Sequence, residues 1–199
     1  MFSHPITEAH TDHALQALAY AGMPDQRNSA AVQESYGSFI RHTLAQWTAL
    51  LPHYTFEAWT TGADGAYANS RDMIADAANA RHLWVFPTDA AQMDSAHPLA
   101  GLVPDSLRVD GLPLLNDVFR AVHDLMGHVV SGGSFGLNGE MKAWLAHRAM
   151  YPRTALAALW CETRGQAAWT NAWGDHSTLP LSERPFAEQK AGMPPLALV

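Results

Sequence analysis

The segment from Asn116 to His128 constrains the fold of this chain most, because it joins an apolar helix face to two histidines. Asn116 is a suitable N-cap, and Asp117 follows where the helix dipole favours an acid. The pattern predicts a helix buried along one side, so polar groups beside that face need partners. The apolar residues recur at helical spacing: Val118, Val122, Leu125 and Met126.

The two histidines of this segment can point to one place only if the helix between them is interrupted. His123 and His128 are five positions apart, which is about 140° around an ideal α-helix. They converge if the helix ends between them, and Gly127 favours such an end. We therefore expect the helix to stop near Gly127.

Length and charge predict one globular domain. The 199 residues, 48% of them hydrophobic, suffice for one sizeable core and are too few for two ordinary domains. We expect a single domain over 1–199, with an N-terminal arm over 1–27 and an irregular tail over 175–199. A formal charge of −7 without a Lys/Arg-rich run argues against a nucleic-acid partner.

Apolar runs and cysteine content narrow the class of protein further. No apolar run approaches the roughly 20 residues of a membrane span, and the start of the chain does not resemble a secretory signal. We therefore expect a cytoplasmic protein without a membrane partner. Because Cys161 is the single cysteine, internal disulfides and Cys-based zinc clusters are excluded. Any metal must be held by histidines and carboxylates.

Hydrophobic periodicity predicts an α+β fold that is predominantly α-helical. A long amphipathic helix is expected from Ser29 to Pro52. Strand-like residues 54–59 and 83–86 flank a helix over 71–81 with Ser70 as its cap, which suggests one parallel strand-helix-strand unit. A loop-rich segment over 87–113 is expected to cover the site as a lid. Two further helices are expected over about 140–150, capped by Asn138, and over about 154–173.

Three consecutive helices bring imidazole and acid groups into an apolar setting. The first carries His123 and His128, the second carries Glu140 and His147 seven positions apart, and the third carries Glu162. Two histidines and one carboxylate form a facial triad, which leaves three positions of an octahedral Fe(II) ion for dioxygen and substrate.

We select Glu162 as the carboxylate of the triad His123, His128 and Glu162. The apolar neighbours of Glu162 predict a deeply packed helix, in which a carboxylate needs a cation. Glu140 stands at a helix start, where the dipole and solvent already stabilise it. His147 has three interpretations, as a fourth ligand, a donor to Glu162 or a core histidine bonded to backbone.

Other residues have supporting roles in this hypothesis. Asp124, Glu140 and His147 are expected to orient ligands or move protons. Residues expected to surround the ligands are Arg120, Arg164 and Gln166, and residues expected to contact substrate are Trp169, Trp173 and Phe135.

Motif spacing excludes two classes of metal enzyme but does not identify the metal. The chain contains no Glu-x-x-His, the motif of ferritin-like di-iron sites, and no His-Glu-x-x-His, the motif of zinc peptidases. Two histidines and one glutamate are nevertheless also a catalytic zinc set. Ligand types alone do not separate iron from zinc.

At the histidines the chain resembles the pterin-dependent aromatic amino acid hydroxylases. Their iron is held by a His-acid-x-x-Gly-His motif, matched by the run His123-Asp124-Leu125-Met126-Gly127-His128, and by a later glutamate, for which Glu162 is the counterpart. The resemblance implies an iron cofactor and a pterin. The chain is shorter than a hydroxylase catalytic domain, its interval between His128 and Glu162 differs, and no stretch resembles a pterin-binding segment. The resemblance therefore supports an iron cofactor more strongly than a pterin cofactor.

A second resemblance covers more of the chain. It is to uncharacterised bacterial and bacteriophage proteins, which have no assigned activity, and it suggests that Glu140, His147, Arg164 and Gln166 belong to one constellation. The matching runs are 119–124, 139–140, 146–147, 162–166 and 186–191.

From these observations we expect a mononuclear non-haem iron oxidoreductase, a monooxygenase or hydroxylase that acts on a small molecule, with aromatic molecules among the candidates. Its partner is then a small-molecule substrate. The alternatives are a zinc hydrolase that uses the same site, with Asp124 or Glu140 as base, and a non-enzymatic interaction protein with a buried polar network.

Overall fold

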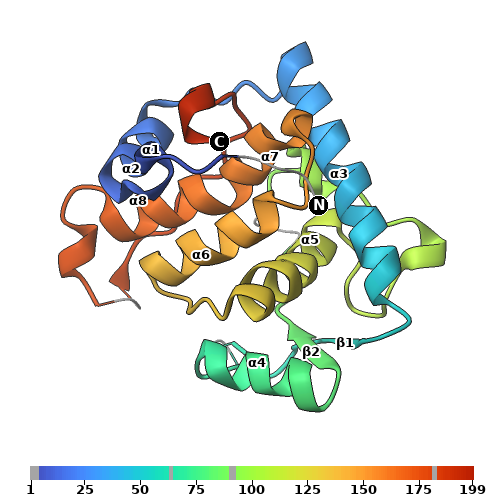
Figure 1. The fold of residues 1–199 in the computed structure, drawn as a ribbon. Coiled ribbons are helices and arrows are strands. Elements are labelled where there is room, and N and C mark those ends of the chain that lie inside the picture. The colour runs from blue at the N-terminus through green and yellow to red at the C-terminus, as the bar shows by residue number, and fades with distance from the viewer. Residues whose placement is uncertain (1–4, 63–64, 90–92, 181–182) are drawn as a thin grey trace.

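The computed structural model describes residues 5–62, 65–89, 93–180 and 183–199. It is predominantly helical with one small parallel sheet, which confirms the expected α+β fold class (Figure 1). The elements are α1 (Glu8–Thr11), α2 (His13–Gly22), α3 (Ala30–Leu50), β1 (Thr55–Ala58), α4 (Ser70–Asn79), β2 (His82–Val85), α5 (Leu115–His123), α6 (Leu137–Arg148), α7 (Leu156–Trp160) and α8 (Gln166–Ala172).

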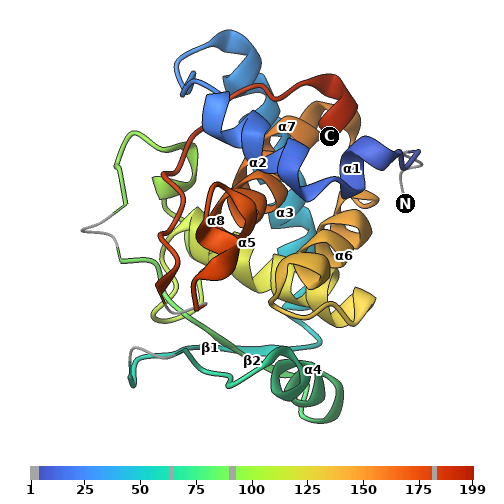
Figure 2. The same cartoon turned by 90° about the vertical axis from the view of Figure 1, so that its left-hand side faces the viewer.

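The long helix and the strand-helix-strand unit form as predicted. Ser29 caps α3 by accepting a hydrogen bond from the backbone N–H of Val32. Strands β1 and β2 pair in parallel with Phe56 opposite Leu83, and α4 connects them. The cap of α4 is Asn69 rather than Ser70. Figures 1 and 2 show the sheet and α4 as a small layer at one end of the helical body.

Helix α5 lies between two hydrophobic cores and so fixes the position of the histidines. Phe119 belongs to a core formed mainly by α3, α6 and α7, whereas Val118 and Val122 belong to a core that includes the sheet. The helix therefore buries more than the single face that was predicted. Its first turn is stabilised by Asp117, which accepts from the backbone N–H of Leu114, so the prediction that Asn116 is the cap is wrong.

The helix does not stop near Gly127, which corrects the prediction. It continues from α5 into a first π segment (Asp124–Val129), whose hydrogen bonds span five residues instead of four. A second π segment (Cys161–Gly165) joins α7 to α8. The helix expected over 154–173 therefore also contains a π-helical stretch. Helix α6 begins after Gly136, earlier than expected, and Asn138 is not its cap.

The expected arm and tail pack onto the helical body. Tyr20 of α2 is buried and donates a hydrogen bond to the Glu188 carbonyl oxygen, and Ala191 and Leu198 of the tail are buried too. The parts of those predictions that concern 1–4 and 181–182 lie outside the described residues. Among the helices that the structure describes, none is both long and apolar enough to cross a membrane.

Candidate metal centre

The first π segment brings His123 and His128 together. Because a π turn holds more residues than an α turn, positions five apart fall near the same side of the helix. The two imidazole rings have centroids 5.2 Å apart and planes at 80° to one another. The convergence that was predicted from a helix end is therefore achieved by a wider turn.

Glu140 joins the two histidines from the first turn of α6. Its Oε2 lies 3.5 Å from Nε2 of His128, and one ligand atom from each of His123, His128 and Glu140 lies within 4.8 Å of the others. Over the described ranges this is the one group of three or more His, Cys, Asp or Glu residues close enough to share an ion. The helix dipole of α6 favours a carboxylate at this position.

His128 is oriented through the other nitrogen of its ring. Its Nδ1 lies 3.1 Å from the Gly133 carbonyl oxygen, which can only accept, so Nδ1 carries a proton. Burial lowers the pKa of His128, but the hydrogen bond and the charge of Glu140 outweigh burial and raise it. Nε2 therefore faces the carboxylate.

His123 has a buried nitrogen without a partner. Its Nδ1 lies 3.0 Å from Nδ1 of His147, whose Nε2 lies 3.0 Å from Oε1 of Gln46. Nε2 of His123 is buried and makes no hydrogen bond within the described part of the chain. Burial lowers the pKa of His123 well below its ordinary value and that of His147 to about 3. Both rings are therefore neutral near pH 7, which leaves a lone pair in the core.

Asp124 is half-buried beside this group. Burial raises its pKa to about 6, with a further rise from Glu140 and opposing effects from His128 and Arg120. Such a carboxyl exchanges its proton near neutral pH. Arg120 itself donates a hydrogen bond to the Phe86 carbonyl oxygen, 3.1 Å away.

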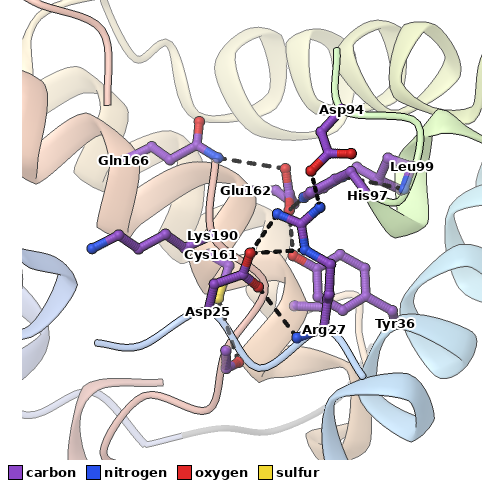
Figure 3. Close-up of polar contacts among 12 residues, drawn as sticks. Asp25, Arg27, Tyr36, Asp94, His97, Leu99, Cys161, Glu162, Gln166 and Lys190 are labelled. Carbon is purple, nitrogen blue, oxygen red and sulfur yellow. Dashed lines mark hydrogen bonds and ion pairs between the residues drawn. The ribbon is translucent and has the colours of Figure 1, made fainter. Parts of the chain in front are cut away.

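Glu162 lies in a separate buried cluster, shown in Figure 3. The Tyr36 hydroxyl donates a hydrogen bond to Oε1, and Nε2 of Gln166 donates to Oε2 over 3.5 Å. His97 accepts from the backbone N–H of Leu99 through Nδ1, so its Nε2 carries the ring proton and faces Oε1 at 3.3 Å. The prediction that Glu162 meets the two histidines is therefore wrong in its geometry.

The correction has a physical reason. A buried carboxylate needs charge compensation or hydrogen-bond donors, and the Tyr36 hydroxyl and the Gln166 amide supply donors here without an ion. His147 does not donate to Glu162 either, because both of its ring nitrogens face other residues. Glu140, set aside because solvent and the dipole stabilise it, is the carboxylate beside the histidines.

In the described part of the loop expected to act as a lid, His97 lies beside Glu162. Asp94 of the same loop pairs with Arg27, which also pairs with Asp25 (Figure 3). The part of this loop at 90–92 lies outside the described residues. The described part of this loop therefore contributes to the Glu162 cluster.

The remaining predicted site residues lie in several separate places. Phe135 packs edge-on against the His128 ring, with centroids 5.4 Å apart. Arg164 is fully buried and contacts His13 over 2.9 Å. Trp169 packs against the ring of His176, and Trp173 is partly exposed at the end of α8. Phe135 is therefore the one predicted substrate contact that the structure places against the histidines.

Sequence reasoning missed Gln46, Tyr36 and His97 as partners of the site residues. Gln46 lies one position before the buried Trp47, so the periodicity of α3 marked this part of the helix as core without marking the amide. His97 lies in the loop-rich segment over 87–113, where hydrophobic periodicity indicates no partner. Only contacts between segments far apart in sequence reveal these roles.

Comparison of the chain with known protein families, with curated proteins and with solved structures finds no match. The geometry of the two clusters is therefore the basis for assigning a function.

Proposed function

We propose that His123, His128 and Glu140 bind one divalent transition-metal ion, and that the protein is a mononuclear non-haem iron oxygenase acting on a small molecule. The observation that carries the proposal is the buried, unpaired Nε2 of His123 beside the facing pair of His128 and Glu140. An unmade hydrogen bond in the interior costs about 1–3 kcal/mol, and a metal ion bound to this atom would offset that cost.

A cation satisfies all three groups together, whereas a proton does not. A proton shared between His128 and Glu140 would pair those two and leave Nε2 of His123 without a partner. A metal ion accepts both imidazole lone pairs and the carboxylate. The ligand atoms, which lie within 4.8 Å of one another, must draw closer, because each would lie about 2.0–2.2 Å from the ion. Glu140 is half-buried in the first turn of its helix, so its side chain can make that adjustment.

The surrounding residues suit oxygenase chemistry on a small apolar molecule. Two histidines and one carboxylate leave open positions on iron, which when bound would supply the redox chemistry for dioxygen. Phe135, edge-on to His128, provides an apolar wall for an organic substrate. Asp124, whose pKa of about 6 suits proton exchange, would give or take a proton at its carboxyl oxygen.

Asp124 also supports a second candidate, a zinc hydrolase. A general base works best when its pKa is near the working pH, and burial brings the carboxyl of Asp124 close to that value. Zinc at the same three ligands would supply Lewis-acid chemistry. Asp124 would then take a proton from the attacking water.

Metal analysis with matched carboxylate variants tests the proposal. Protein purified without a tag should contain about one iron per chain, and Glu140→Gln should lose it while Glu162→Gln keeps it. About one zinc instead of iron would favour the hydrolase. Metal loss in Glu162→Gln but not in Glu140→Gln, with both variants folded, would contradict the ligand set.

Activity assays then separate the two enzyme classes. Iron-loaded protein should consume dioxygen with small aromatic substrates and a reductant, and Asp124→Asn should slow the reaction while leaving metal content unchanged. Failure of the wild-type protein to bind iron, zinc or cobalt would remove both enzyme functions and leave a buried structural network.

A further inference from the structure

We infer that Gln46 on α3 determines which ring nitrogen of His123 carries the proton, acting through His147. The inference rests on the proposed metal centre for its functional meaning. It assigns Gln46 and His147 as positioning residues, which keep Nε2 of His123 free of a proton and available to a metal.

The first step is the orientation of the Gln46 amide. Its Oε1 lies 3.0 Å from Nε2 of His147. Nε2 of the same amide is buried and makes no hydrogen bond within the described residues. The atom of Gln46 that contacts the imidazole is therefore the amide oxygen.

The second step follows from the chemistry of neutral imidazole, which has one N–H and one lone pair. Because Oε1 of Gln46 can only accept, Nε2 of His147 carries the proton and Nδ1 of His147 holds the lone pair. Nδ1 of His123, 3.0 Å away, must then donate to that lone pair. The proton of His123 is thereby placed on Nδ1, and its Nε2 is left as a lone pair.

The opposite arrangement shows what Gln46 prevents. If an amide N–H faced His147, both rings would exchange tautomer, and Nε2 of His123 would carry a proton beside His128 and Glu140. A protonated nitrogen cannot bind a metal. Partners that orient metal-binding histidines in this way typically change metal affinity 10- to 100-fold when removed.

Three variants on α3 test the inference. Gln46→Met keeps the length of the side chain and removes the acceptor, Gln46→Glu keeps an acceptor, and Gln33→Met changes an exposed glutamine of the same helix. Zinc titration by calorimetry should show affinity about 10- to 100-fold weaker in Gln46→Met, and close to wild type in the other two.

Nitrogen-15 NMR of the histidine rings in metal-free protein gives a readout that a loss of packing would not imitate. Wild type should show His123 protonated on Nδ1 and His147 on Nε2, and Gln46→Met should show a mixture of tautomers at both. His123 protonated on Nε2 in wild type, or unchanged tautomers and affinity in Gln46→Met, would overturn the inference. If wild type shows the expected tautomers but binds no metal, the proposed function fails while the tautomer relay is supported.

Discussion

Gly127 is the position where the smallest change should disturb the candidate site most. A Cβ atom added there would lie 3.0 Å from Cε1 and 3.1 Å from Nδ1 of His123, and 3.2 Å from the Ala143 carbonyl oxygen. The carbonyl belongs to the backbone of α6 and cannot easily move. The imidazole is confined as well, because Nδ1 contacts His147 and the ring packs near Phe119. Gly127→Ala should therefore displace His123 by a few tenths of an ångström.

Two opposing effects set the size of the change in stability. Replacing glycine by alanine inside a helix typically stabilises by about 0.5–1 kcal/mol, because the unfolded chain loses freedom. Forcing a methyl group into a packed site typically costs about 1–3 kcal/mol. We expect Gly127→Ala to be destabilised by up to about 2 kcal/mol, which for a chain of this length lowers Tm by about 2–4 °C per kcal/mol.

A glycine of α3 provides the matched control. At Gly37 the nearest atom to an added Cβ is Nη1 of Arg41, the end of a flexible side chain, at 3.5 Å. Gly37→Ala should therefore be stabilised by up to about 1 kcal/mol and should bind zinc like wild type. Thermal unfolding and zinc titration of both variants measure the contrast. If Gly127→Ala is as stable as Gly37→Ala and binds zinc as tightly as wild type, the close packing of His123 has no functional role.

Two further predictions concern groups outside the metal centre. Tyr36→Phe removes a donor from the buried Glu162 carboxylate and should destabilise by about 1.5–3 kcal/mol in urea unfolding at pH 7; a loss below about 0.5 kcal/mol would mean that the cluster does not depend on that donor. Burial raises the pKa of Asp76, but hydrogen bonds with Tyr67 and His82 outweigh burial and lower it. A lowered carboxyl pKa stabilises the fold above the unfolded value of about 3.9, and that stability is lost as pH falls through the folded value. Asp76→Asn should therefore be less stable than wild type by about 1–2 kcal/mol at pH 6, with the difference shrinking towards pH 3; a difference independent of pH would contradict this.

The scaffold could be predicted from sequence where local pattern and tertiary packing agree. In α3 the cap at Ser29 and the apolar spacing of Val32, Tyr36 and Phe39 all indicate one helix, and burial of those side chains follows. The parallel pairing of β1 and β2 likewise follows from two short apolar strands separated by one helix. Such elements depend on contacts close in sequence or on simple periodicity.

The π segments could not be predicted in this way, and the geometry of the site depends on them. Apolar spacing over Val118, Val122 and Leu125 fits an ordinary α-helix, and nothing local shows that the next turn widens at Asp124. Under α geometry, His123 and His128 would point to different sides, so a helix end at Gly127 was the simplest way to join them. The lack of a side chain at Gly127 instead lets the His123 ring and the α6 backbone approach the widened turn.

The choice between the two carboxylates shows why burial alone does not identify a metal ligand. Glu162 was favoured because its helix is apolar, and its carboxylate is indeed buried, but Tyr36 of α3 and Gln166, one turn further along, donate to it. A carboxylate with its donors in place has little to gain from a cation that must first lose its water. Within the described residues Glu140 has no such set of donors, and its Oε2 lies 3.5 Å from Nε2 of His128. The carboxylate that lies beside the two histidines, and not the one in the more apolar helix, is therefore the better candidate for a ligand.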